Sequence, residues 1–147
     1  MTTLAFTGTR EGMTNEQIDA VRSLVSELNG LTRAYHGDCV GADAQFANLI
    51  LQRLATPIEI FACPSNFPGM TAHAYHTHRR DPSDPLERNR HMVECAGVLI
   101  AAPKESVEQL RGGTWYTVRY GRRMKRQVYI VLPDGSVTGN PSQPHSR

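Results

Sequence analysis

The sequence contains few cysteines and no long apolar run, and both features restrict what the protein can be. Its three cysteines, Cys39, Cys63 and Cys95, lack Cys-x-x-Cys spacing, which argues against a disulfide framework or a zinc site. No apolar run approaches the ~20 residues of a membrane-spanning helix. The start, MTTLAFTGTR, lacks the basic and apolar regions of a signal peptide. We therefore expect a cytoplasmic protein with reduced thiols and no membrane partner.

The length and composition are those of one globular domain. The chain has 147 residues, of which 39% are hydrophobic and 20% charged, enough to bury a substantial core. We expect a single domain over 1–135 and a flexible polar tail over 136–147. The net charge is +2, but residues 79–126 contain 11 Lys/Arg and 6 Asp/Glu. This excess of +5 suits an anionic ligand or nucleic acid, although for RYGRRMKR alone a solvated helix face is the simpler explanation.

Strands and helices are predicted to alternate along the chain. Apolar runs predict strands at 4–7, 32–35, 58–63, 97–103 and 127–133, and amphipathic stretches predict helices at 14–30, 42–54, 85–95 and after 111. Thr14-Asn-Glu-Gln17 fits a capping box, and Asp84-Pro85 supplies an N-cap and a first-turn proline. The alternation, with strands apolar on both faces, predicts an α/β doubly wound domain with a mainly parallel sheet of about five strands and helices on both faces.

The unusual polar and glycine-rich segments follow the predicted strands. Thr7-Gly-Thr-Arg10 ends the first strand, HGDCVGAD over 36–43 ends the second, and RGGTWYT over 111–117 follows the fourth. In an open parallel sheet the ligand lies outside the carboxyl ends of the strands, where the strand order reverses. The three segments together therefore predict one ligand crevice.

The first and third segments suit phosphate binding. Gly8 permits close backbone approach, while Thr9 and Arg10 offer a hydroxyl and a bidentate donor. Gly112 and Gly113 leave N–H groups free at a helix N-terminus, where the dipole favours an anion, and Thr114 adds a hydroxyl. The alternative is that the glycines only make tight turns.

The second segment supplies candidate glycines and acids. Gly37 and Gly41 are candidate ligand-binding residues. Asp38, at a strand end, is expected to aim its carboxylate at the crevice, toward ribose hydroxyls or a base amino group; it could equally satisfy turn backbone groups. Asp43 is either a ribose ligand or a first-turn acid favoured by the helix dipole.

A loop over 64–85 interrupts the alternation, with four prolines and a histidine cluster. His73, His76 and His78 lie in this Pro/Gly-rich loop without a cysteine or carboxylate at ligand spacing, so we expect no metal site. Loops of this length are often functional. We hypothesise that this one closes over the ligand, with a histidine, Arg79 or Arg80 reaching phosphate.

The combination of FTGTR, HGDCVGADAQFA, LERNRHMVECAGVLIAAP and RGGTWYT resembles the SLOG superfamily over residues 4–133. That group includes the lonely-guy phosphoribohydrolases and the DprA-like DNA-processing proteins. The resemblance implies a Rossmann-like nucleotide-binding fold, a homodimer, and ligand contacts by Arg88 and Asn89 in the segment that matches E-R-K-x-x-M. The relatives' P-G-G-x-G-T-x-x-E loop ends in a glutamate that assists glycosidic cleavage. No acid occupies that place here, and Thr117 comes nearest.

Two functions from different classes follow. The first is binding of a nucleotide or nucleotide-derived molecule, as a sensor, carrier or sequestering protein without a further cofactor. The alternative is an N-glycosidic hydrolase or phosphoribosyl-transfer enzyme using Arg88 with Asp38 or Asp43, since cleavage through an oxocarbenium-like state needs a carboxylate. Single-stranded DNA binding through the basic RYGRRMKR segment is a weaker third prediction, because interleaved aromatics for stacking are missing.

Overall fold

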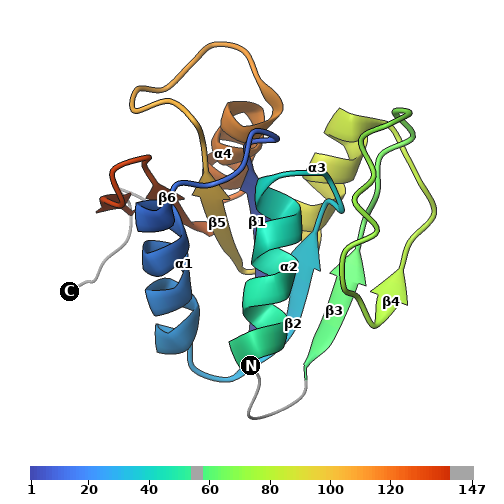
Figure 1. The fold of residues 1–147 in the computed structure, drawn as a ribbon, viewed down its shortest axis with the longest axis horizontal. Helices are drawn as coiled ribbons and strands as arrows, with labels where there is room; N and C mark the ends of the chain where they lie inside the picture. Colours follow the sequence, from blue (N-terminus) through green and yellow to red (C-terminus); the bar gives the residue numbers. More distant parts are fainter. Residues whose placement is uncertain (54–57, 140–147) are drawn as a thin grey trace.

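The computed structural model describes residues 1–53 and 58–139 and consists of one mainly parallel sheet between helices. Figure 1 shows α1 and α2 in front of the sheet and α3 and α4 behind it. The strands are β1 (Thr2–Gly8), β2 (Leu31–His36), β3 (Glu59–Ala62), β4 (His78–Arg79), β5 (Val98–Ala102), β6 (Gln127–Val131) and β7 (Val137–Thr138), and the helices are α1 (Asn15–Glu27), α2 (Ala42–Arg53), α3 (Pro85–Cys95) and α4 (Gly113–Arg123). The predicted doubly wound α/β class is confirmed.

The sheet has the order β4-β3-β2-β1-β5-β6-β7. The five predicted strands form its centre, and two-residue strands extend both edges. All neighbouring pairs are parallel except β6 and β7. The chain builds outward from β1 to β4, then returns to place β5 on the other side of β1. The strand order therefore reverses between β1 and β5, which is where such sheets bind ligands.

Both faces of the central strands are buried, which explains their continuous apolar sequences. In β1, Leu4 and Phe6 belong to the cluster on the α1–α2 side, where Phe6 stacks on Phe46 with ring centroids 4.5 Å apart. Ala5, between them, faces the second cluster, to which Met92 and Trp115 contribute from α3 and α4. This two-sided burial fixes the position of β1 at the centre of the sheet.

The predicted helix starts form as the sequence indicates. Thr14 and Gln17 make both hydrogen bonds of the capping box, and the Asp84 carboxylate caps α3 by accepting from the backbone N–H groups of Leu86 and Glu87. The prediction that the second helix reaches Leu54 falls partly outside the described residues. Of the predicted tail, the structure describes residues up to 139, which include β7. Within 1–53 and 58–139, none of the helices has the length and apolar character needed to traverse a bilayer.

Candidate functional site

A cleft of about 550 Å³ opens at the carboxyl ends of β1 and β5. Its walls come from the segment after β1, the first turns of α3 and α4, and the loop between β3 and α3. Nine of the predicted ligand-binding or catalytic residues line it: Gly8, Thr9, Arg10, Asp43, Arg88, Asn89, Gly112, Gly113 and Thr114. Three others, Gly37, Asp38 and Gly41, are not among its lining residues. The cleft therefore gathers side chains from all three predicted loops.

The first turn of α4 faces this cleft without a side-chain cap. Gly112 occupies the N-cap with φ 104° and ψ 143°, and no side-chain hydrogen bond caps the helix. The first intrahelical bond runs from Tyr116 N–H to the Gly112 carbonyl at 3.0 Å. The first N–H groups of an α-helix have no partner within the helix. Together with the helix dipole, they make this turn a site of positive potential.

The segment after β1 forms the opposite wall. Thr9 is buried, donates its N–H to the Ala102 carbonyl at 3.0 Å and accepts the Glu11 N–H with its hydroxyl at 3.1 Å. The Thr9 side chain thus shapes the turn before α1. Arg10 is exposed, and its Nη1 lies 3.2 Å from the sulfur of Met70. Its guanidinium is therefore accessible to a ligand in the cleft.

Arg88 lies in the floor of the cleft and is almost fully buried. Its Nη1 donates to the carbonyls of Gly37 at 2.7 Å and Cys63 at 2.8 Å, and its Nε donates to Asn89 Oδ1 at 2.7 Å. Nη2 lies 3.7 Å from the thiol of Cys39. Arg88 thus joins α3 to the ends of β2 and β3, so its structural role is direct, while its position in the cleft lining also lets it act on a ligand.

Asp43, in the first turn of α2, is the buried acid among the three that line the cleft, the others being Glu11 and Glu105. It is buried, and Oδ2 accepts the Cys39 N–H at 3.3 Å. Burial raises its pKa from 3.8 to about 6, although Arg88 and the N–H groups of Cys39 and Gly37 lower it in part. A carboxyl that titrates near neutral pH can give or take a proton, so Asp43 is the strongest acid–base candidate in the cleft.

The structure places Asp38 elsewhere than expected. Its carboxylate is fully buried beneath the β3–α3 loop instead of facing the crevice. Oδ1 accepts the Ala74 N–H at 2.8 Å, and Oδ2 accepts from Arg79 Nη1 at 2.7 Å. The reason is a backbone turn at Asp38, with φ 52°, which directs the side chain toward the loop. The carboxylate therefore meets neither expectation from the sequence: it faces away from the crevice, and its partners are 36 and 41 positions away instead of in its own turn.

Close packing accounts for two of the predicted glycines. A Cβ at Gly41, where φ is 91°, would lie 2.3 Å from the Arg10 carbonyl oxygen, so this glycine lets the segment after β1 cross the start of α2. A Cβ at Gly37 would lie 2.7 Å from both Arg88 Nη1 and Asp43 Oδ2. Gly37 therefore shapes the cleft by making room for its charged floor.

The three loop histidines do not converge. His73 is exposed, His76 Nδ1 lies 2.9 Å from the Ala74 carbonyl, and His78 Nε2 lies 3.1 Å from Glu59. No group of three or more potential metal ligands occurs within the described parts of the chain. Of the two loop arginines, Arg79 binds Asp38 and Arg80 contacts His91. The loop residues that do line the cleft are Ser65, Phe67 and Met70.

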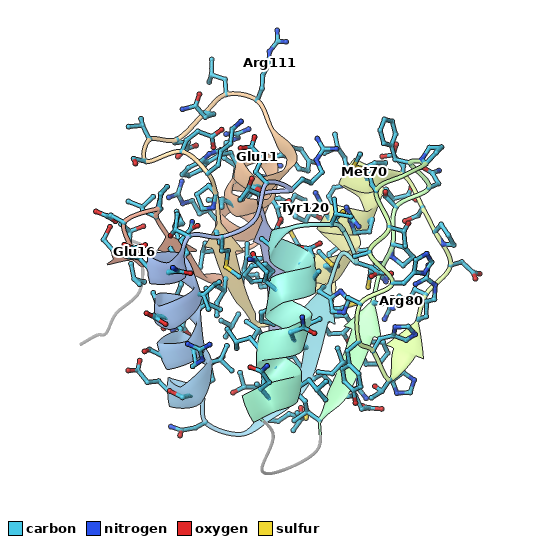
Figure 2. All side chains as sticks on the ribbon, in the orientation of Figure 1. Glu11, Glu16, Met70, Arg80, Arg111 and Tyr120 are labelled. Atoms are coloured by element: carbon cyan, nitrogen blue, oxygen red, sulfur yellow. The ribbon has the colours of Figure 1, made fainter. Side chains whose placement is uncertain are left out.

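Several residues that line the cleft were not among the candidate site residues from the sequence. Lys104 Nζ reaches Glu11 Oε2 at 2.7 Å, and Trp115 Nε1 donates to Glu105 Oε1 at 2.9 Å. These contacts link the loop after β5 to both neighbouring walls. Figure 2 shows Glu11 and Met70 at the same end of the sheet, and Arg111 extending outward from the loop before α4. Lys104 directly follows the fourth predicted strand, which is the one clue that could have placed it here.

Thr117, the residue nearest to the place of the relatives' glutamate, and the arginines of the basic segment all make contacts within the protein. The Thr117 hydroxyl donates to the Gly113 carbonyl at 2.7 Å, within α4. In the basic segment, Arg119 and Arg122 bind Glu108 at 3.3 and 3.0 Å. Arg126 donates to the Val93 carbonyl at 3.1 Å. Much of the charge in RYGRRMKR is thus engaged within the protein.

Comparisons with known proteins identify the fold. No family model matches the chain, and no curated protein matches it in sequence. The structure is similar to that of the molybdenum cofactor binding protein from the phototrophic bacterium Rippkaea orientalis, with a TM-score of 0.66, 16% identity and coverage of 89% of this chain and 76% of that one. It is also similar to TM1055, a structural-genomics target, with a TM-score of 0.60, 11% identity and coverage of 87% and 72%. The Rossmann-like fold is thus shared with proteins of very different sequence.

Proposed function

We propose that this protein binds a phosphate-bearing nucleotide or nucleotide-derived molecule in the cleft, as a SLOG-type binding protein. The observation that carries the proposal is the uncapped first turn of α4, with Gly112 and Gly113, opening onto a cleft at the reversal of the strand order. Arg10 and Arg111 add positive charge around the same cleft, whereas Lys104 is paired there with Glu11. An anion placed at this turn would gain both backbone donors and the helix dipole.

The similarity to a molybdenum cofactor binding protein supports a small-ligand role. It does not choose the ligand, because the two chains share only 16% identity. The resemblance of FTGTR, HGDCVGAD and RGGT to SLOG proteins favours a nucleotide. A sensor, carrier or sequestering protein needs no catalytic acid, which agrees with the absence of a glutamate after Thr114.

Calorimetry with inorganic phosphate, ribose 5-phosphate, AMP, adenosine and the molybdenum cofactor tests the proposal. We expect the phosphorylated compounds to bind and adenosine to bind at least about tenfold more weakly, since a charge-assisted hydrogen bond contributes ~1.5–3 kcal/mol. Failure of all five compounds to bind below about 1 mM, a free energy near −4 kcal/mol, would count against it.

Gly113→Ala is the matching variant. Its Cβ would lie 3.6 Å from Asn89 Nδ2, an ordinary contact, so the fold should persist while the methyl group obstructs the approach of phosphate to the backbone. Gly97→Ala is the control, because it lies just before β5 at the opposite end of the sheet and meets only Thr3 Oγ1 at 3.8 Å. Equal affinities of the two variants would contradict phosphate binding at α4.

Asp43 supports a second candidate function, N-glycosidic hydrolysis of a nucleoside monophosphate. Its carboxyl lines the cleft, has a pKa of about 6 and is held near Arg88, so it can act as an acid or base in cleavage of the base–sugar bond. Release of free base from a nucleotide panel, detected by chromatography, tests this. Release by the wild type and loss in Asp43→Asn would support the enzyme, and no release from any nucleotide would contradict it.

A homodimer is also proposed, with the exposed face of α3 and α4 as its contact surface. Tyr116 and Tyr120 stack there with ring centroids 6.5 Å apart, and Arg90 Nη1 and Glu94 Oε2 bind their hydroxyls. Such amphipathic aromatics are common in interfaces. Light scattering should give twice the mass of 16.3 kDa for the wild type.

Single-stranded DNA binding remains the weaker prediction, and the absence of a salt-sensitive mobility shift with an oligonucleotide would remove it.

A further inference from the structure

The loop between β3 and α3 forms one wall of the cleft, although β4 is its only regular element among the described residues. Its base is closed by two backbone bonds, from Asn66 N–H to the Ser83 carbonyl at 2.8 Å and from Ser83 N–H to the Pro64 carbonyl at 3.3 Å. These bonds do not reach the distal part of the loop, residues 70–79, which we call the distal lobe. Its C-terminal part is held separately, because β4 pairs with β3 and the Thr77 N–H donates to the Ile60 carbonyl at 2.9 Å. Met70, at the start of the distal lobe, lines the cleft.

One side chain joins the middle and the C-terminal end of the distal lobe to the β2–α2 segment. The Asp38 carboxylate accepts the Ala74 N–H at 2.8 Å and the Arg79 guanidinium at 2.7 Å. Its backbone carbonyl accepts the Ala72 N–H at 2.8 Å. The Asp38 side chain is fully buried, whereas that of Arg79 is 33% exposed. The contacts therefore run from one buried residue of the β2–α2 segment to three positions of the distal lobe.

The backbone of Asp38 is held in an uncommon conformation. Its φ of 52° lies in the left-handed region, which costs energy for residues with a Cβ but is tolerated best by Asn and Asp. The Asp38 N–H donates to His36 Nδ1 at 3.0 Å, so the hydrogen of this imidazole is on Nε2, which donates to the Tyr75 carbonyl at 2.9 Å. Such conformations persist where several contacts fix them, and they concentrate near functional sites.

We infer that Asp38 is a positioning residue that fixes the distal lobe and thereby one wall of the ligand cleft. Val40 N–H donates to the Met70 carbonyl at 3.0 Å, and the Met70 sulfur contacts Arg10 at 3.2 Å. Release of the distal lobe would therefore displace both Met70 and its contact with Arg10. The effect on affinity rests on the proposed function of the cleft, while the effect on the distal lobe does not.

Hydrogen exchange and calorimetry on the full chain test the two parts separately. Asp38→Asn keeps an oxygen for Ala74 and a residue suited to positive φ, but removes the charge that binds Arg79. We expect faster exchange at the amides of Val40, Ala72 and Ala74, and at least about fivefold weaker binding of AMP, because a mobile wall raises the ordering cost of binding. Both measurements are made where all variants are fully folded, so that a loss of global stability alone does not change the affinity.

Changes at the other end of the ion pair complete the test. Arg79→Gln should reproduce the faster exchange and weaker AMP binding of Asp38→Asn. Arg79→Lys, which keeps the positive charge, should retain most of the wild-type affinity for AMP. The double variant Asp38→Asn/Arg79→Gln should bind AMP no more weakly than the weaker of the two single variants. Asp19→Asn, which breaks the exposed Asp19–Arg22 pair in α1, is the matched control and should change neither measurement. If Asp38→Asn does not fold, the two Arg79 variants decide the question from the partly exposed side.

Unchanged exchange in Arg79→Gln would overturn the inference. So would faster exchange with unchanged AMP affinity, because the distal lobe would then have no influence on the cleft. If wild-type protein binds no AMP or other phosphate compound, the proposed function fails; faster exchange in Arg79→Gln that Arg79→Lys reverses would still support the anchoring role of Asp38.

Discussion

Arg88 Nη1 and Asp43 Oδ2 both border the space where Gly37 lacks a side chain, each 2.7 Å from the position that a Cβ would take. Both groups are buried at the floor of the cleft. Arg88 lowers the pKa of Asp43, but burial acts more strongly in the other direction. The floor therefore combines a fixed positive charge with a carboxyl that titrates near pH 6, and Gly37 gives both of them room.

Gly37→Ala should destabilise the fold by about 1–3 kcal/mol, the usual cost of overpacking. The new methyl group would displace Arg88 Nη1, which is held by the carbonyls of Gly37 and Cys63, so the variant must lose hydrogen bonds to relieve the clash. Urea denaturation measures the change. Gly97→Ala, with its nearest contact at 3.8 Å, is the control. Equal stability of the two variants would show that the floor is looser than these distances indicate.

Arg88→Lys should cost about 2–4 kcal/mol although the charge is kept. A lysine cannot reproduce the planar donors that bind the Gly37 carbonyl, the Cys63 carbonyl and Asn89 together, and buried acceptors left without a donor are costly. The comparison is Arg22→Lys, at an exposed ion pair, where a change within about 0.5 kcal/mol is expected. A similar small loss at Arg88 would mean that water replaces the guanidinium.

The sequence predicted the sheet and the cleft because those depend on local patterns. Apolar runs identified the five central strands, and Thr14 and Asp84 marked helix starts that the structure reproduces. Glycines and polar groups after strands predicted the position of the cleft, since parallel strands end at one edge. The short strands β4 and β7 have two residues each, too few for a periodic pattern.

Side-chain direction at the site could not be predicted in the same way. Asp38 and Asp43 lie five positions apart in the segment HGDCVGAD, yet one carboxylate turns beneath the distal lobe and the other into the cleft. The difference depends on a positive φ at Asp38 and on Arg79, 41 positions away. Likewise, nothing near Lys104 in the sequence indicates that it meets Glu11 across the cleft.

The raised pKa of Asp43 predicts a pH-dependent contribution to stability. In the folded protein the pKa is about 6, against 3.8 for an ordinary aspartate. Between these values the folded state holds a proton that the unfolded state has lost, so the contribution is full below about pH 4 and falls as the pH rises through 6. The loss amounts to about 3 kcal/mol, since one pKa unit corresponds to about 1.4 kcal/mol.

Asp43→Asn isolates this contribution, because the amide does not titrate while its oxygen can still accept from Cys39 N–H. The free energy of unfolding of the wild type minus that of the variant, measured in urea from pH 4 to pH 7, should decrease across this range. A difference that stays constant with pH would contradict the raised pKa, and a difference that increases would show that Arg88 outweighs burial.

Two glycines with positive φ allow backbone strain to be separated from steric exclusion. Gly41 and Gly69 have φ values of 91° and 81°, but a Cβ at Gly41 would lie 2.3 Å from the Arg10 carbonyl oxygen, whereas one at Gly69 has nothing within 4 Å. Gly69→Ala should therefore lower the free energy of unfolding only by the cost of holding an alanine at positive φ, about 1–2 kcal/mol. Gly41→Ala should cost about 2 kcal/mol more, because the clash is with backbone and the segment after β1 must shift. Thermal and urea denaturation of both variants give the comparison; equal losses would mean that this segment moves freely, and the cleft wall carrying Thr9 and Arg10 would then be mobile as well.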